Sequence, residues 1–350
     1  MKTTVIIPNY NGKHFMEPCM EALRKQSQKD FCLLIVDNGS SDGTIPWIHE
    51  NMPEAVYLQP GDRLPQVHTA TSQYGFPIYV MALDTNTGFS GAVNVGIRAS
   101  VTDYVILLNN DTEVHEDYLL ELERSMERSP KVFSVSSKMI QLHERRLMDD
   151  AGDLYTVIGW GFQRGVGQLS TGYTEACRVF TACAGAAIYR REVFEEIGYF
   201  DELHFAYLED LDVGYRARIA GYENWYCPNA IVYHVGSGTS GSKYNSFKVK
   251  LAARNSVYLN YKNMPLLQLI LNAIPLAFGY AVKTRFFIKR GFGDDYKAGL
   301  KEGFATLDRC KKVRFQWKNL GHYLHIEWEL IYNTLIYAYE YAKRRGIHLS

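Results

Sequence analysis

Two amides and a carboxylate follow directly on an apolar, strand-like run. Residues 105–108 read Val-Ile-Leu-Leu, and Asn109, Asn110 and Asp111 come next. Open α/β sheets keep their ligand sites at the carboxyl ends of the strands, so we expect these side chains at such a site. A hard cation that bridges phosphates needs only one or two carboxylates, because substrate and water supply its other ligands. The run indicates a metal and diphosphate site, and a helix cap at Asp111 is the competing explanation.

Two earlier apolar segments also end in polar side chains. The residues after segment 4–7 are Pro8, Asn9, Tyr10 and Asn11, and those after segment 33–36 are Asp37, Asn38, Gly39 and Ser40. A helical pattern separates the segments, and this β-α-β order predicts parallel strands that end at one edge of a sheet. There Asp37 could accept a hydrogen bond from a pyrimidine imide or a ribose hydroxyl, and Tyr10 offers a face for stacking. An Asx turn would also explain the second segment.

Three acids stand at the start of a predicted helix among apolar neighbours: Glu209, Asp210 and Asp212. The N-terminal end of a helix stabilises acids, and Asp212 can pair with Arg216 at i,i+4, which is a complete structural explanation. Partly buried carboxylates in apolar surroundings are also often tuned to take up protons. Both explanations are compatible with the residues alone.

His234 ends another apolar run, and a glycine-rich stretch at 235–241 follows it. A single histidine after a strand is commonly a structural residue, and a ligand role is the alternative. The glycines would allow the following loop to close over a bound molecule.

Glycines also crowd residues 86–96, just after a predicted strand. A dinucleotide-binding turn needs glycines at offsets two and five, whereas Gly88 is followed here by Gly91 and Gly96. The spacing excludes that fingerprint and favours a helix that begins on a turn softened by glycine.

Five motifs in this order resemble those of glycosyltransferase family 2. They lie at 8–11 (Pro-Asn-Tyr-Asn), 36–44, 86–96, 108–111 (Leu-Asn-Asn-Asp) and 209–212 (Glu-Asp-Leu-Asp). The likeness extends through 200–202, 207–216 and 232–236 and covers residues 1–260. It is closest to the branch that contains bacterial rhamnosyltransferases of surface-polysaccharide synthesis.

The resemblance implies a fold and a reaction. The fold is the A-type (GT-A) glycosyltransferase fold, an α/β architecture with a single mixed, mostly parallel sheet flanked by helices, here with a C-terminal helical appendage. The reaction is the inverting transfer of a sugar, for this branch L-rhamnose, from a dTDP- or UDP-sugar to a glycan or polyprenyl-linked acceptor. It needs a divalent cation, Mn²⁺ or Mg²⁺.

The resemblance also implies roles for individual residues. Asp210 would be the general base, with Glu209 as the alternative, and Asp111 and His234 would hold the cation. The predicted donor-binding residues are Pro8, Asn9, Tyr10, Asn11, Asp37, Asn38, Ser40, Asn86, Gly88, Phe89, Asn94, Asn109 and Asn110. Those assigned to the acceptor are Trp160, Gly185 and Asp212, although Asp212 is also expected to brace Arg216.

One departure from the family pattern concerns Asn109, which stands where many relatives carry the first Asp of Asp-x-Asp. A single carboxylate then remains for the cation. A catalytically silent nucleotide- or glycan-binding relative in an assembly complex is therefore the alternative function, and the retained Asp111 and Asp210 favour the enzyme.

Composition is compatible with this function. The chain has 350 residues, of which 47% are hydrophobic, and its 38 basic residues equal its 38 acidic ones, so no global basic field favours nucleic acid. The six cysteines form no C-x-x-C pair, and no leader precedes the first strand, so we expect reduced thiols and a cytoplasmic protein. We predict a catalytic domain at 1–260, with a nucleotide-binding part at 1–112 and an acceptor part at 113–260.

The remaining segment, 261–350, is predicted to be helical. Residues 264–282 are apolar except for Gln268 and Asn272, but internal prolines argue against a membrane-spanning helix. An interfacial hairpin in peripheral contact with a membrane and a helical pair packed on the catalytic domain are both compatible with this pattern. Glycines at 159–172 predict a flexible loop in which Trp160 could line an acceptor groove.

Overall fold

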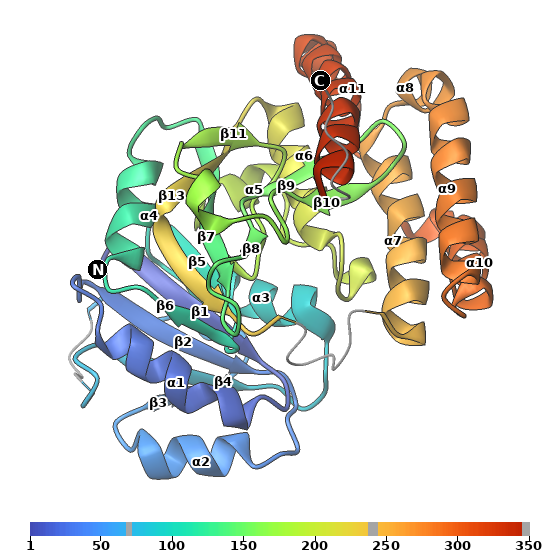
Figure 1. Ribbon diagram of the computed structural model, residues 1–350. Coiled ribbons are helices and arrows are strands. Elements are labelled where there is room, and N and C mark those ends of the chain that lie inside the picture. The colour runs from blue at the N-terminus through green and yellow to red at the C-terminus, as the bar shows by residue number, and fades with distance from the viewer. Residues whose placement is uncertain (68–71, 237–243, 345–350) are drawn as a thin grey trace.

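The computed structural model describes residues 1–67, 72–236 and 244–344 and has one large sheet at its centre. Figure 1 shows helices on both faces of this sheet and a group of C-terminal helices beside it. The predicted closing loop at 235–241 falls outside the described residues from 237 onward.

Within the described residues, the central sheet has eleven strands in the order β11-β13-β7-β12-β5-β1-β2-β4-β3, with β6 beside β13 and β8 beside β7. Its strands are β1 (Thr3–Asn9), β2 (Phe31–Asp37), β3 (Val56–Leu58), β4 (Ile78–Ala82), β5 (Tyr104–Leu108), β6 (Thr112–Val114), β7 (Val132–Gln141), β8 (Met148–Asp150), β11 (Cys177–Val179), β12 (Ala186–Arg190) and β13 (Glu223–His234). A separate antiparallel pair joins β9 (Asp153–Tyr155) to β10 (Gly161–Gln163). The strands β3, β4, β2, β1 and β5 all run parallel, as the β-α-β order predicts, and β12 is antiparallel to β5.

The helices cover both faces of the sheet and extend beyond it. They are α1 (Lys13–Arg24), α2 (Thr44–Asn51), α3 (Gly88–Ala99), α4 (Tyr118–Met126), α5 (Val193–Ile197), α6 (Glu209–Ala220), α7 (Ser246–Asn263), α8 (Leu266–Leu271), α9 (Ala273–Ile288), α10 (Gly293–Ala305) and α11 (Leu320–Arg344). Short 3₁₀ turns lie at Ser170–Gly172, Glu202–His204, Leu307–Arg309 and Trp317–Asn319.

Two apolar cores lie on opposite faces of the sheet. Successive strand residues point to opposite faces, so Val5 and Ile7 join the core under α1, α2 and α4, whereas Ile6 joins the core under α3, α5 and α6. β2 and β5 are buried along their whole length because both of their faces are covered. This rigid centre fixes the strand ends that carry the predicted site.

The C-terminal helices share a third core with α6 and the edge of the central sheet. Leu211 and Tyr215 of α6 lie in it together with Leu276 of α9 and Ile326 of α11. The predicted domain boundary at residue 260 falls inside α7. The division of the chain into domains stays a prediction. No described helix combines the length and the apolar composition that a membrane crossing requires.

Candidate active site

The predicted donor-binding side chains meet at the carboxyl ends of β1, β2 and β5. Asn9 and Asp37 are register partners at the ends of adjacent parallel strands. Asn9 Nδ2 donates to Asp37 Oδ1 at 2.8 Å, and Asn110 Nδ2 donates to Asn9 Oδ1 at 2.5 Å. Ser40 N donates to Asp37 Oδ2 at 3.0 Å. Three motifs that are distant in sequence therefore form one hydrogen-bonded edge.

Tyr10 lies beside this edge with its ring open to solvent. Its side chain is 38% exposed, whereas Asn9 is fully buried. Asn11 has a left-handed backbone with φ 51°, which Asn tolerates better than most residues, and its Oδ1 accepts from Ser41 N at 2.8 Å. Pro8 lies in register with Val36. The two loops are thus joined, and Tyr10 is placed where a flat ring could stack on it.

The side chain of Asn38 holds the loop before α3. Its Nδ2 donates to Asn86 Oδ1 and to the Gly88 carbonyl, both at 3.0 Å, and its Oδ1 accepts from Thr87 N at 2.9 Å. A Cβ at Gly88 (φ +77°) would lie 2.4 Å from the Phe205 carbonyl oxygen, so glycine is required there. Asn38 therefore has a positioning role, whereas Asn86 remains exposed to a ligand.

Asn94 is also a positioning residue. Its Nδ2 donates to the Phe200 carbonyl at 2.8 Å and to Glu202 Oε1 at 2.9 Å, and its Oδ1 accepts from Phe200 N at 3.0 Å. The ring of Phe89 meets the Phe200 ring edge-on at 6.3 Å. The amide of Asn94 is used within the protein, and the structure gives it the task of holding residues 200–202 in place of donor binding.

Asp111 and His234, the predicted metal ligands, lie side by side. β6 pairs with β13 so that His234 is opposite Thr112, next to Asp111. His234 Nε2 is 3.4 Å from Asp111 Oδ1, and His234 Nδ1 is 2.6 Å from Asp149 Oδ2. Burial opposes a charge on His234, but hydrogen bonds to Asp111 and Asp149 raise its pKa to about 10.

This triad fits a divalent cation. A carboxylate that binds one imidazole nitrogen of a metal-ligating histidine fixes the tautomer and turns the other nitrogen toward the ion. Asp149 does this at Nδ1, so the Nε2 atom that faces Asp111 would bind the cation in place of a proton. Asp149 was not predicted from the sequence.

The predicted general base lies after a strained loop. Phe205, Tyr207 and Leu208 have left-handed backbones, with φ 62°, 70° and 66°. Such residues cost about 1–3 kcal/mol each and cluster at functional sites. Asn255 Nδ2 donates to the carbonyls of His204, Ala206 and Tyr207 at 2.8 Å each and so stabilises this loop. α6 then begins at Glu209.

The pKa values of both acids at the start of α6 lie above their usual range. Burial raises the pKa of Asp210 to about 6, although the amides of Leu211 and Ala184 oppose this. Burial and the neighbouring charge of Asp210 raise the pKa of Glu209 to about 8. Glu209 Oε2 has no hydrogen-bond partner within the described part of the chain. These properties suit a group that accepts a proton near neutral pH.

Two further carboxyl groups, which were not predicted, adjoin these acids. Side-chain oxygens of Asp150 and Asp153 and the sulfur of Cys183 lie within 4.8 Å of one another. Burial raises the pKa of Asp150 to about 8 and that of Asp153 well above its usual range, and the charge of Asp210 adds to both shifts. β8 therefore carries Asp149 toward His234 and Asp150 toward this carboxyl cluster.

These acids predict a pH dependence of stability. Asp150 has a higher pKa in the folded chain than in the unfolded chain, so the folded state binds the extra proton and loses stability as the pH rises from 5 to 8. The Asp150→Asn variant, which cannot ionise there, should gain about 1–3 kcal/mol relative to the unmodified protein across this window. Urea unfolding of both proteins at pH 5 and pH 8 measures the difference.

Comparison with the unmodified protein is required because His204 acts in the opposite direction. Burial lowers its pKa to about 4, so its contribution to stability increases as the pH rises toward 6.5. A stability difference between Asp150→Asn and the unmodified protein that stays constant from pH 5 to pH 8 would contradict the assignment.

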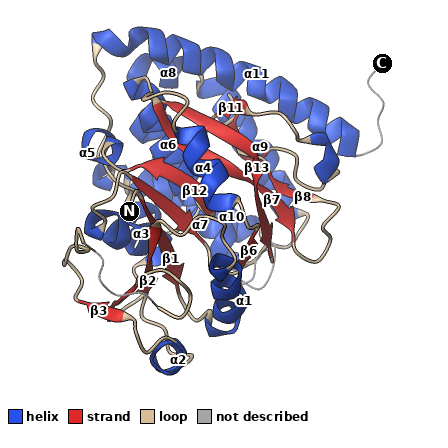
Figure 2. Cartoon of the chain, turned by 90° about the vertical axis from the view of Figure 1, so that its left-hand side faces the viewer, coloured by secondary structure: helices blue, strands red, loops and turns tan. Residues whose placement is uncertain are grey.

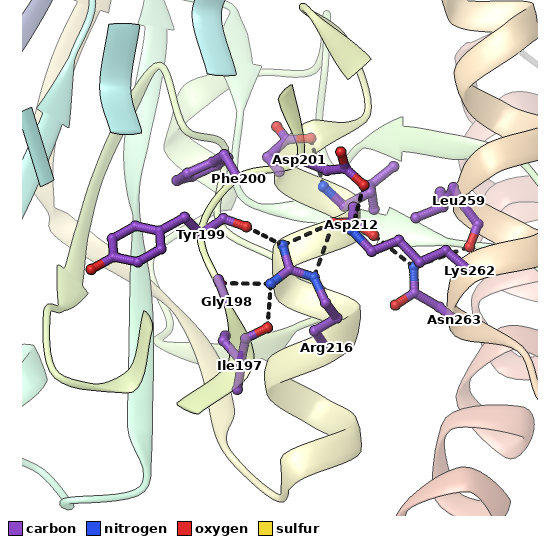
Figure 3. Close-up of polar contacts among 12 residues, drawn as sticks. Ile197, Gly198, Tyr199, Phe200, Asp201, Asp212, Arg216, Leu259, Lys262 and Asn263 are labelled. Carbon is purple, nitrogen blue, oxygen red and sulfur yellow. Dashed lines mark hydrogen bonds and ion pairs between the residues drawn. The ribbon is translucent and has the colours of Figure 1, made fainter. Parts of the chain in front are cut away.

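Asp212 is the centre of a buried ion network rather than an acceptor contact (Figure 3). Its fully buried carboxylate accepts from Arg216 Nη2 at 2.8 Å, Lys262 Nζ at 2.9 Å and Asn263 Nδ2 at 2.8 Å. Arg216 also donates to the carbonyls at 197–199, and Lys262 pairs with Asp201 at 2.7 Å. The predicted pairing with Arg216 is confirmed, and Asp212 is corrected from acceptor binding to positioning α6.

The loop around Trp160 is packed, so the expectation of a flexible loop is wrong. Residues 161–163 form β10, and Trp160 Nε1 donates to the Gly279 carbonyl of α9 at 3.2 Å. Its ring meets the Tyr337 ring of α11 edge-on at 5.4 Å. A Cβ at Gly161 would lie 2.3 Å from Leu211 Cδ1, so the loop also touches the first turn of α6.

Gly185 lies against the end of β5. Its carbonyl accepts from Asn109 N at 2.8 Å, and a Cβ there would lie 3.1 Å from Asn109 Nδ2. The backbone at Gly185 therefore approaches the Asn109–Asp111 turn, and the amide of the neighbouring Ala184 contacts Asp210. Its acceptor contact and that of Trp160 stay predictions.

Comparison with known proteins agrees with this geometry. The family model described as Glycosyl transferase family 2 matches residues 4–198. The chain is 24% identical over 249 residues to the N-acetylglucosaminyl-diphospho-decaprenol L-rhamnosyltransferase of Mycobacterium tuberculosis, covering 68% of this chain and 77% of that relative. It is 21% identical over 238 residues to the poly-beta-1,6-N-acetyl-D-glucosamine synthase of Staphylococcus aureus, covering 68% and 51%.

Two solved structures share the fold. GalNAc-T7 with UDP, GalNAc and Mn²⁺ superposes with a TM-score of 0.56 at 14% identity, over 89% of this chain and 55% of that chain. The mannosyltransferase PcManGT from Pyrobaculum calidifontis, in complex with GDP-Man and Mn²⁺, superposes with a TM-score of 0.52 at 15% identity, over 87% and 75%. The fold expected from the sequence motifs is thereby confirmed.

Proposed function

This chain belongs to glycosyl transferase family 2 and is a glycosyltransferase, and on that premise we propose that it transfers L-rhamnose from a dTDP- or UDP-sugar to a polyprenyl-linked acceptor with inversion. The observation that carries the proposal is the Asp111–His234–Asp149 triad beside the donor edge at Asn9 and Asp37. The name of the mycobacterial relative specifies both the sugar and a decaprenol-linked acceptor, which supports the same classes here.

The donor would lie along the carboxyl edge of the sheet. Asp37 would accept from the base or ribose, Tyr10 would stack on the base, and the exposed Asn86 would donate to the diphosphate or the sugar. Asp111 and His234 would hold a Mn²⁺ or Mg²⁺ ion, which supplies charge stabilisation for the departing diphosphate. Two structures with this fold were crystallised with Mn²⁺, which supports the choice of cation.

Asp210 would act on the acceptor. Its carboxylate takes the proton of an acceptor hydroxyl, and the hydroxyl oxygen forms a bond to the anomeric carbon from the side opposite the diphosphate. The bond from the anomeric carbon to the phosphate oxygen breaks, and its electron pair leaves with the nucleoside diphosphate. Glu209, protonated at neutral pH, would donate a hydrogen bond within the site.

The acceptor would approach along the Trp160 loop. This loop contacts both the first turn of α6 and helix α9. Lys283 Nζ of α9 lies 5.5 Å from the centre of the Trp160 ring. Burial lowers the pKa of Lys283 to about 8. A half-buried cation in this place would favour an acceptor that carries phosphate.

The Asp111→Asn variant tests the metal site. We expect it to weaken Mn²⁺-dependent binding of dTDP or UDP by about 10- to 100-fold while the fold stays intact, because Asp111 lies beyond a strand end and Asp149 remains as a partner of His234. Calorimetric titration with and without Mn²⁺ measures this effect. Glu113→Gln is the matched control, since it removes an acid two residues away, on β6, that pairs only with Arg145 among the described contacts. Unchanged Mn²⁺ dependence in Asp111→Asn would refute the site.

A panel of dTDP- and UDP-sugars identifies the donor. The correct donor should raise the unfolding temperature most in the presence of Mn²⁺, because only the folded state binds it. Transfer from that donor to a polyprenyl-diphosphate-linked sugar would then establish the reaction. Nucleotide binding without transfer to any glycan or lipid-linked acceptor would contradict the proposed reaction.

A further inference from the structure

Helix α11 has two apolar faces, and only one of them is covered. Its inner face packs Tyr323, Ile326 and Leu330 into the third core. Its outer face carries large side chains that are 44–65% exposed: Leu324, Trp328, Ile331, Tyr332, Leu335 and Tyr339. These positions recur at three- and four-residue spacing, so they form one continuous stripe along the helix.

Helix α8 and the start of α9 continue this surface. Their outward residues are 62–82% exposed: Leu266, Leu267, Ile270, Leu271, Ile274 and Phe278. The two polar side chains of this segment point inward, where Gln268 and Asn272 donate to Glu327 Oε2 of α11 at 2.7 and 2.9 Å. Figures 1 and 2 show α8 and α11 at the same end of the molecule in views 90° apart. We call the twelve outward residues of these helices the α8–α11 face.

The exposed charged side chains between residues 311 and 319 are all cations. The acids of α11 have partners within the protein: Glu327 binds α8, Glu329 pairs with Arg218, and Glu340 is buried. Exposed cations precede α11 and lie next to the highly exposed Trp317: Lys311, Lys312, Arg314 and Lys318. The result is an apolar face, rich in aromatic rings, with a cationic border at its N-terminal end.

We propose that the α8–α11 face docks on the surface of an anionic phospholipid bilayer. Interfacial helices bury a stripe of Leu, Ile, Trp and Tyr in the headgroup boundary, with cations directed to anionic lipids. A second copy of the chain fits less well, because protein interfaces carry a hydrogen bond for about every 100–200 Å² and this face offers few polar groups. The helices of this face would lie along the bilayer surface, with their exposed apolar side chains in the headgroup boundary.

Vesicle co-sedimentation of the full chain tests this proposal. The protein should sediment with vesicles that contain phosphatidylglycerol and bind less to pure phosphatidylcholine. The quadruple variant Leu267→Gln, Ile270→Gln, Leu324→Gln, Trp328→Gln should lose at least tenfold in vesicle affinity, because it removes apolar area without changing charge. The matched control is Val56→Gln with Tyr57→Gln, since these residues are exposed on β3, outside the face.

Charge substitutions test the cationic border independently of the apolar face. Each of Lys311→Gln and Lys318→Gln should weaken binding to anionic vesicles by about fivefold and leave binding to phosphatidylcholine unchanged. Analytical ultracentrifugation without vesicles tests whether a second copy of the chain binds to the α8–α11 face instead. A dimer that the quadruple variant abolishes would overturn the proposal in favour of a second copy, and a monomer that ignores both kinds of vesicle would overturn it outright.

Discussion

Replacement of Asp210 by asparagine is expected to lower sugar transfer by about 10²- to 10⁴-fold while nucleotide binding survives. Asparagine keeps the volume of the side chain and can still accept the hydrogen bond that Leu211 N donates to Asp210 Oδ1 at 2.7 Å. It cannot take a proton from the acceptor. The turnover number should therefore fall while the dissociation constant of the nucleoside diphosphate, measured by calorimetry, stays within a few-fold of its normal value.

The pH profile gives a second measurement of the same residue. Burial raises the pKa of Asp210 to about 6, so transfer by the unmodified enzyme should rise with pH through that value as the carboxylate loses its proton. This limb should be absent from the residual activity of Asp210→Asn. Glu209→Gln is the matched control, because Glu209 is the adjacent buried acid and glutamine preserves its size. Near-normal transfer by Asp210→Asn together with an inactive Glu209→Gln would assign the base to Glu209 instead.

The hydrogen-bonded edge at Asn9, Asp37 and Asn110 could be predicted from the sequence because it depends on local order. Apolar runs that end at Asn9, Asp37 and Asn110, with a helical pattern between the first two, already require parallel strands with their ends together. The register of β1 with β2 then places Asn9 against Asp37. Residue type and strand order are sufficient for this part of the site.

The partner of His234 could not be found in this way. Asp149 lies on a three-residue strand whose position depends on its pairing with β7, in a part of the chain that carries no family motif. Asp150 and Asp153 share this difficulty. The only signal in the sequence is the presence of three acids within the apolar stretch 147–155, which does not reveal the residues that they face.

The direction in which a side chain points could not be predicted from the sequence either. Asn94 and Asp212 have the residue types of ligand-binding groups, but their polar atoms are used inside the protein. In the C-terminal segment, the apolar pattern could not choose between a packed and an interfacial helix pair. The structure buries Leu276 and Gly279 against the rest of the chain and leaves Ile274 and Phe278 exposed, so the packing is confirmed and the membrane contact stays a proposal.

The buried network around Asp212 leads to the largest expected loss of stability. The Asp212→Asn variant should reduce the free energy of unfolding by about 3–5 kcal/mol, because it leaves Arg216 and Lys262 buried without their shared counter-charge. Both cations are less than a tenth exposed, and Asp212 is fully buried. These cations hold the pKa of Asp212 well below its usual range, so the network should persist as the pH falls to 4 and fail only in stronger acid.

Urea unfolding of Asp212→Asn at pH 7 measures this loss, and Glu21→Gln on α1 is the matched control. Glu21 also pairs with an arginine one helical turn away, Arg24 at 2.7 Å, but both side chains are exposed, so this variant should leave the unfolding midpoint nearly unchanged. The α6 turn that Asp212 anchors also carries Asp210, so transfer by the folded fraction should fall while the pH limb near 6 remains. If Asp212→Asn had normal stability but a raised KM for the acceptor, Asp212 would be an acceptor-binding residue after all. Only a direct contact with the substrate would change KM without changing stability.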